Sequence, residues 1–139
     1  MPEATEHPDN SDSSCLFCRW IRARKAVETL GTVAAFNDGY PVTDGHLLIA
    51  PLRHTPDWFS MTSKELRDSD TLIRALVERI RPRDPLVTGF NIGTNIGASA
   101  GQTVFHAHIH LIPRRDGDTA NPKGGVRGVI DGKREYHPF

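Results

Sequence analysis

The alternation of apolar and polar positions predicts one long helix and one short helix. Apolar residues recur at helical spacing between Thr62 and Arg81, which is typical of an amphipathic helix. Thr62 and Glu65 have the spacing of a capping box at its start, and Pro82 is expected to end it. The segment Leu16–Lys25 carries apolar residues at the same spacing, so a shorter helix is expected near the N-terminus.

Short apolar runs between turn-forming residues predict the strands. Residues 27–36 form two of them around a central glycine turn, and an apolar run that proline stops predicts a buried strand over residues 46–51. Two more strands are expected over residues 86–91 and 104–112. Sequential strands with one long helix favour the α+β class, with an antiparallel sheet and the helices packed on one side of it.

Composition divides the chain into one domain with two polar ends. The 139 residues support a single domain with a modest core. Residues 1–14 are polar and acidic, which predicts a disordered leader. Residues 15–114 hold the predicted helices and strands. Residues 115–139 turn polar and glycine-rich, which predicts a C-terminal arm.

Charge and hydropathy narrow the class of protein. The 17 basic residues are matched by 17 acidic ones, so the formal net charge is zero. A generic nucleic-acid binder carries an excess of positive charge to neutralise phosphates, so any phosphate has to be bound by a local, shaped site. No apolar stretch approaches the roughly 20 residues that span a bilayer, and residues 1–14 lack the apolar segment of a secretory signal. The sequence therefore predicts a cytoplasmic protein without membrane contact.

Three histidines, His106, His108 and His110, alternate with apolar residues in the last predicted strand. Side chains at positions i, i+2 and i+4 of a strand share a face, so the three imidazoles are expected to line one groove. Structural histidines are one interpretation, and a metal site is another, although no acidic residue lies between Pro85 and Arg115 to complete it. The third is a nucleophilic histidine that attacks phosphorus.

A loop of small residues, 93–102, precedes the histidines and favours the third interpretation. Small residues let backbone N–H groups approach an anion closely. Asn95, Gln102 and Thr103 add side-chain donors. Loop and histidines together therefore indicate a phosphate site.

These residues resemble the signature of the histidine-triad (HIT) family, H-φ-H-φ-H-φ-φ, in which φ is an apolar residue. The match covers Asn95–His110 and extends upstream to Gly45–His54, which is similar to the family segment G-H-x-L-φ-x-P-x-x-H. Cys15–Cys18 resembles the cysteine pair of zinc-containing members. The resemblance implies the HIT fold, an antiparallel sheet with one long helix and a short N-terminal helix, and the activity of a nucleotide hydrolase or transferase.

The resemblance also implies a role for each candidate residue. His108 would be the nucleophile that forms a nucleotidyl-histidine intermediate, with His110 and His46 lining the phosphate site. The positions that match phosphate contacts in the family are Asn95, Gln102 and Thr103. For Asp38 two interpretations stay open. It would bind ribose hydroxyls by resemblance, or it is a turn residue, because Asn-Asp-Gly at residues 37–39 is good turn chemistry.

The residue at the third histidine position favours hydrolysis. His110 is present, as in hydrolases of the family, whereas galactose-1-phosphate uridylyltransferases have glutamine there. The resemblance thus implies hydrolysis of a nucleoside polyphosphate or phosphoramidate at the α-phosphate. Residues 113–118 differ from the Trp-Pro-Pro-Gly ending of the phosphoramidate branch and are closer to the fragile-histidine-triad and bacterial branches, which favours diadenosine polyphosphates. Two alternatives remain, a transferase or phosphorylase with the same intermediate and a nucleotide-binding protein that regulates a partner.

The C-x-x-C pair at Cys15 and Cys18 has three interpretations: a redox pair, two unligated thiols, or half of a zinc site. No thioredoxin-like pattern surrounds it, and zinc prefers four sulfur or nitrogen ligands. The resemblance implies that His54 and His106 complete a structural zinc site, which assigns His106 to the metal. It also implies a homodimer and no catalytic cofactor.

Overall fold

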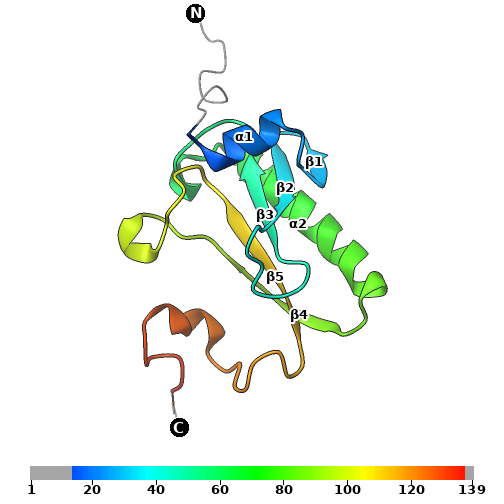
Figure 1. Ribbon diagram of the computed structural model, residues 1–139, viewed down its shortest axis with the longest axis vertical. Coiled ribbons are helices and arrows are strands. Elements are labelled where there is room, and N and C mark those ends of the chain that lie inside the picture. Colours follow the sequence, from blue (N-terminus) through cyan, green and yellow to red (C-terminus); the bar gives the residue numbers. More distant parts are fainter. Residues whose placement is uncertain (1–13, 137–139) are drawn as a thin grey trace, which may run out of the picture.

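The computed structural model describes residues 14–136, which form a five-stranded antiparallel sheet with two α-helices (Figure 1). The expected leader, apart from Ser14, lies outside the described residues. The strands follow the order β1-β2-β3-β5-β4 across the sheet. Their bounds are Glu28–Leu30 for β1, Val33–Asn37 for β2, Leu47–Pro51 for β3, Val87–Gly93 for β4 and Ile109–Arg115 for β5. The α+β class is confirmed.

Helix α2 runs over Ser63–Arg83, and its start follows the sequence prediction. The Thr62 side chain accepts from the backbone N–H of Glu65, whose carboxylate accepts from the N–H of Thr62, so the capping box forms. The prediction that Pro82 ends the helix is wrong, because Pro82 lies inside the last turn. The helix ends one residue later, since Asp84 precedes a second proline and that position disfavours helical backbone.

Helix α1 runs over Leu16–Arg22, three residues shorter than the predicted segment. Arg24 has a positive φ of 56°. Its N–H donates to the carbonyl of Ile21, and the N–H of Lys25 donates to that of Trp20. These are the two bonds of a Schellman motif, which ends the helix with a left-handed residue.

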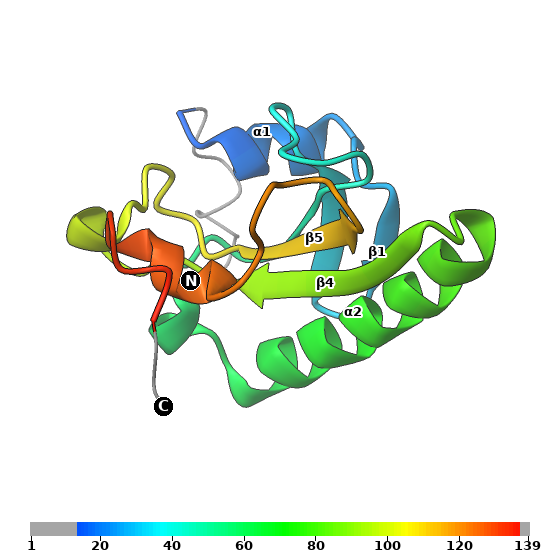
Figure 2. The ribbon, with the colours of Figure 1, turned by 90° about the horizontal axis from the view of Figure 1, so that it is seen from below.

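The two helices lie on opposite faces of the sheet (Figure 2), so the expectation that they pack on one side is wrong. Helix α2 packs on a cluster with Ile49 and Leu111, and α1 packs on a cluster with Phe36 and Leu48. The physical reason lies in the central strands. Every residue of β3 is buried, so both faces of that strand need an apolar cover.

The last strand, β5, begins at Ile109 rather than at the predicted Val104. It pairs with β3 only through Ile109, His110 and Leu111. Before that point the chain leaves the ladder, and the N–H of Ala107 donates to the carbonyl of Thr55 at 2.7 Å. His110 therefore lies in the strand, whereas His106 and His108 lie in the segment that leads into it.

The remaining elements are short. The described residues also contain three 3-10 helices: η2 over Trp58–Ser60, η3 over Ala98–Ala100 and η4 over Gly125–Val129. The last belongs to the C-terminal arm, drawn orange to red in Figure 1, which folds back beside the end of β4. Within residues 14–136, no helix is long and apolar enough to span a membrane.

Candidate active site

A chain of hydrogen bonds links His46 to His110. The backbone N–H of Val42 donates to Nδ1 of His46 at 3.1 Å, and Nε2 of His46 lies 2.9 Å from Nδ1 of His110. Because Nδ1 of His46 accepts, its proton sits on Nε2 and is donated to His110. His110 then carries its own proton on Nε2. The main chain at Val42 thus sets the tautomer of both rings and gives His110 an outward N–H donor.

Asp38 contacts the same chain. Its Oδ2 lies 3.4 Å from Nε2 of His46, and its Oδ1 accepts the backbone N–H of Tyr40 at 2.7 Å, the bond of an Asx turn. Asp38 therefore forms the turn, and its binding of ribose hydroxyls stays a prediction. Burial lowers the pKa of His46, against the opposing attraction of Asp38. Burial also lowers the pKa of His110, with the neighbouring His108 and His46 adding to the effect.

His108 is held by backbone groups. Its Nδ1 lies 2.8 Å from the carbonyl oxygen of His106, so the Nδ1–H donates and the lone pair sits on Nε2. The hydroxyl of Thr94 donates to the carbonyl of His108 at 2.7 Å. The ring is half-buried, with its centroid 5.4 Å from that of His110. Burial lowers the pKa of His108. The arrangement presents a fixed imidazole with an unprotonated Nε2.

Phe17 contacts two of the candidate histidines, which the sequence did not predict. Its ring, on α1, lies with centroids 4.9 Å from His108 and 5.3 Å from His106. It is fully buried. The available signal was its position between the two cysteines, which places an aromatic side chain beside whatever those cysteines contact. Thr94 was missed as well, and a lone threonine beside a glycine gave no signal for a bond to a backbone carbonyl.

The loop after β4 separates the three predicted phosphate contacts. The side chain of Asn95 is half-buried and has no partner within the described residues. Gln102 is buried, with Oε1 accepting from Gly97 and Nε2 donating to the carbonyls of Pro56 and Val104. Thr103 is exposed. The amide of Gln102 therefore shapes the loop in this structure, and phosphate contact by the three residues stays a prediction.

A cavity of about 990 Å³ opens onto part of this site. His46, His110 and Asn95 line it, whereas Asp38, Gln102, Thr103 and His108 are not among its lining residues. A volume of this size suits a drug-sized or nucleotide-sized ligand. The C-terminal arm forms much of the remaining wall.

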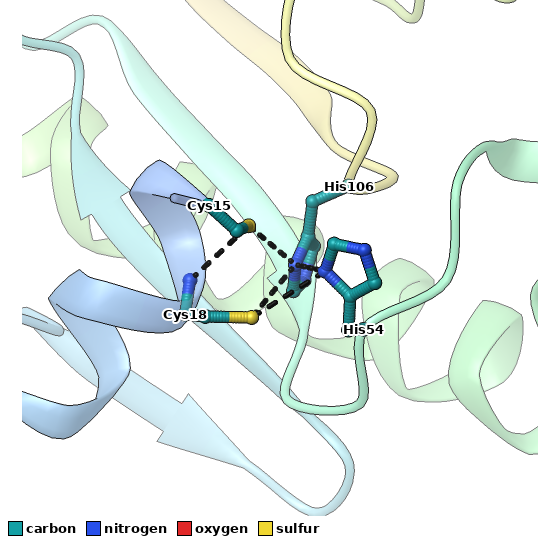
Figure 3. Close-up of side chains that lie close together, drawn as sticks. All are labelled: Cys15, Cys18, His54 and His106. Carbon is teal, nitrogen blue, oxygen red and sulfur yellow. Dashed lines mark hydrogen bonds between the residues drawn. The ribbon is translucent and has the colours of Figure 1, made fainter. Parts of the chain in front are cut away.

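A second cluster consists of four side chains that point toward one another (Figure 3): Cys15, Cys18, His54 and His106. One ligand atom of each lies within 4.8 Å of the others. Nδ1 of His106 is 3.4 Å from Sγ of Cys15 and 3.7 Å from Sγ of Cys18. Nδ1 of His54 is 3.4 Å from Sγ of Cys18 and 3.2 Å from Nδ1 of His106. The sequence-predicted metal ligands are therefore brought together in space.

The spacing of this cluster fits a tetrahedral metal ion. With bonds of about 2.3 Å to sulfur and about 2.0 Å to nitrogen, a tetrahedron separates sulfur from nitrogen by about 3.5 Å and two nitrogens by about 3.3 Å. The ring of His106 is also turned correctly, since its Nε2 lies 2.8 Å from the carbonyl of Pro51 and donates to it. That bond leaves the lone pair on Nδ1, toward the cysteines. The cluster could hold a metal ion.

A second group, Asp38, His46 and His110, also places its ligand atoms within 4.8 Å of one another. Both nitrogens of His46 are committed, Nδ1 as an acceptor from Val42 and Nε2 as a donor to His110. No lone pair of His46 is free for a cation, so the geometry is that of a hydrogen-bonded chain.

Similarity to known proteins identifies the family of this chain. The model of the HIT domain matches residues 22–117, which is more than half of the chain. The chain belongs to the HIT family. A solved zinc-bound histidine-triad protein from Mycobacterium smegmatis has a TM-score of 0.70 and 30% identity, covering 78% of this chain and 80% of that one. The HIT fold is therefore shown for this chain.

Two similar proteins have named activities. The adenosine 5'-monophosphoramidase of Candida albicans is 32% identical over 76% of this chain and 74% of its own length. The asymmetrical bis(5'-nucleosyl)-tetraphosphatase of Schizosaccharomyces pombe is 39% identical over 61% of this chain but only 46% of its own length. Several others are described only as HIT-like proteins. Nucleotide hydrolysis is thus the activity named among similar members of the family.

Proposed function

We propose that this HIT protein hydrolyses a nucleoside polyphosphate or phosphoramidate at the α-phosphate, through a covalent intermediate on His108, and releases a nucleoside monophosphate. The observation that carries the proposal is the bond from Nδ1 of His108 to the carbonyl of His106. It fixes the tautomer in which Nε2 is unprotonated, and a neutral imidazole nitrogen is a competent nucleophile.

The reaction has two displacements at phosphorus. In the first, the Nε2 lone pair of His108 forms a bond to the α-phosphorus, and the bond from that phosphorus to the leaving oxygen or nitrogen breaks with its electron pair. In the second, a water oxygen attacks the same phosphorus and the bond to Nε2 breaks. The proton that the water loses ends on solvent or on the departed group, and His108 returns neutral.

The neighbouring side chains would stabilise the charge on the transferring phosphate. The Nε2–H of His110, set by its bond from His46, would donate to a phosphate oxygen, which is the electrostatic assistance such reactions need. Asn95 lines the same cavity and has an uncommitted amide. Gln102 and Thr103 would supply further donors, and Asp38 would accept from the ribose hydroxyls.

The metal in the four-residue cluster would be zinc with a structural role. Two thiolates and two imidazoles are the ligands that zinc prefers, and with four protein ligands no coordination position stays open for a substrate. Bound there, zinc would fix α1 to the loop after β3. No catalytic cofactor enters the proposed reaction.

We further propose a homodimer, joined along the free edge of the sheet. β4 is an edge strand, and Ile92 on it is 52% exposed. An exposed edge with an apolar side chain is a ready surface for pairing with a second copy. Light scattering of the full chain tests this assembly, and a monomer at micromolar concentration would contradict it.

The test of the function is product release by the purified protein. Diadenosine polyphosphates and adenosine 5'-monophosphoramidate are incubated with wild type, with His108→Ala and with Phe105→Ala, an exposed neighbour in the same segment. AMP release by wild type and Phe105→Ala, with a loss of at least about 10³-fold in His108→Ala, supports the proposal. Equal turnover by all three proteins would sink it.

A second measurement separates hydrolysis from transfer. The same reactions are run with inorganic phosphate added. Appearance of ADP in place of AMP would mean that phosphate, not water, accepts the nucleotidyl group, and the protein would then be a phosphorylase. Binding of nucleotide by folded, metal-loaded wild type without any turnover would instead favour a nucleotide-binding interaction protein.

A further inference from the structure

The C-terminal arm forms a wall of the cavity that contains His110. In the sheet register, Gly93 pairs with His110 and Asn91 with Ile112, and all four residues line the cavity from the strand side. More than half of the lining residues belong to the arm, among them Asp131 and Arg134. The arm is therefore part of the candidate substrate site.

Its own contacts give the arm a defined shape. Nδ2 of Asn121 donates to Oε2 of Glu135 at 2.6 Å, which ties the start of the arm to its end. Nε of Arg127 donates to the carbonyl of Lys133 at 3.1 Å. Gly124 has a φ of 71°, and a Cβ there would overlap the carbonyl oxygen of Arg134. Only glycine permits this close approach, so the two halves of the arm lie against each other.

Arg134 is one of two arginines that line the cavity. It is half-buried, and its guanidinium has no hydrogen bond or ion pair with any residue from 14 to 136. Arg114 also lines the cavity, but its donors go to both oxygens of Asp118 and to Asn91. Asp131 is exposed to solvent, which screens its charge.

We propose that Arg134 binds the phosphates beyond the scissile α-phosphate, so that the arm selects substrates whose leaving group is a polyphosphate. The inference rests on the proposed function, because it assigns a role to another residue that lines the same cavity. A guanidinium matches phosphate oxygens with a fork of N–H donors and gains most where it is partly desolvated. His110 meets the α-phosphate, and Arg134 meets the anionic chain that departs.

The experiment measures binding, so that it does not depend on turnover. Calorimetry with the full chain compares AMP with α,β-methylene-ATP, in which the bond next to the α-phosphorus cannot be hydrolysed. The proteins are wild type, Arg134→Ala, Arg134→Lys and Lys133→Ala. Lys133→Ala is the matched control, since it removes a positive charge at the adjacent position and Lys133 does not line the cavity.

The expected result is selective. Arg134→Ala lowers the affinity for α,β-methylene-ATP by about tenfold and leaves the affinity for AMP unchanged. Arg134→Lys recovers part of the lost affinity. Lys133→Ala leaves both ligands unchanged. Equal weakening of both ligands in Arg134→Ala, or of neither, overturns the role of Arg134 while the proposed function stands. If wild type binds neither ligand, the proposed function fails and this inference fails with it.

Discussion

His106 belongs to the candidate metal site and also contacts the candidate nucleophile, His108. Its Nδ1 lies 3.4 Å from Sγ of Cys15, and its carbonyl oxygen accepts the Nδ1–H of His108 at 2.8 Å. One residue therefore connects the two sites through opposite ends, side chain and main chain. We therefore expect a displacement of the His106 ring to disturb the backbone carbonyl that orients His108.

If the four-residue cluster holds zinc as proposed, loss of that metal should reduce both stability and turnover. Cys18→Ser removes one proposed metal ligand and leaves the candidate catalytic histidines in place, and we expect its Tm to fall by about 10 °C or more. Turnover should fall with it at a temperature where the variant is still folded. Metal analysis, calorimetry and AMP release measure the three effects. Added zinc should restore chelator-treated wild type but not the variant, and an unchanged metal content in Cys18→Ser would contradict the assignment.

The His46–His110 bond predicts a non-additive pair of substitutions. His110→Ala removes the proposed phosphate donor and should lower turnover about 10²-fold to 10³-fold. His46→Ala should lower it less, about tenfold, because His46 acts only by setting the tautomer of His110. When His46→Ala is combined with His110→Ala, turnover should fall no further than in His110→Ala alone. Rates that simply multiply would show that His46 acts independently of His110.

The turn between β1 and β2 predicts a strict requirement for glycine. Gly31 has a φ of 57°, and a Cβ there would overlap Oδ2 of Asp68. That oxygen accepts from both the N–H and the hydroxyl of Thr32, which ties the turn to α2. Gly31→Ala should lower the free energy of unfolding by about 1–3 kcal/mol. Gly39→Ala is the control, because a Cβ at Gly39 meets no atom within 4 Å, and equal urea midpoints for the two variants would contradict the prediction.

Glu65 predicts a pH dependence of stability. Burial alone would raise the pKa of Glu65, but the hydrogen bonds from Arg53 and Thr62 outweigh it and the pKa is lowered. A lowered folded-state pKa stabilises the protein above the ordinary glutamate pKa of about 4.3, and that contribution is lost as the pH falls through the folded value.

The measurement compares wild type with Glu65→Gln across pH. The Tm of wild type should exceed that of Glu65→Gln at pH 7, and the gap should close below about pH 4. Glu78→Gln, an exposed position on the same helix, should match wild type throughout. A gap that widens toward acid would mean that the ion pair between Arg53 and Glu65 is not its source.

Local patterns predicted most elements of the fold. The capping box at Thr62 and the apolar periodicity of α2 are short-range signals, and so is the buried run of β3. The fully apolar character of β3 also indicated a cover on both faces, yet the prediction put both helices on one side. Alternation along a strand shows which residues are buried. It does not show that the C-x-x-C helix, distant in sequence, supplies the second cover.

The start of β5 was mispredicted for a related reason. Residues 104–108 are of types that favour strands. However, the N–H of Ala107 donates to Thr55 and the ring of His106 donates to Pro51, so this segment is held outside the strand ladder. The candidate histidines came from sequence motifs. Their tautomers did not, because they depend on the N–H of Val42 and on the carbonyl of His106, which no side-chain pattern records.

The groups that orient the rings of His106 and His108 are both main-chain carbonyl oxygens, those of Pro51 and His106. Every residue type carries a carbonyl, so no single substitution can delete either acceptor. Mutational tolerance should therefore be uneven across this centre. At Pro51, which supplies one of the two carbonyls, the acceptor survives any substitution that keeps the backbone path, whereas replacement of either imidazole removes the donor of its bond.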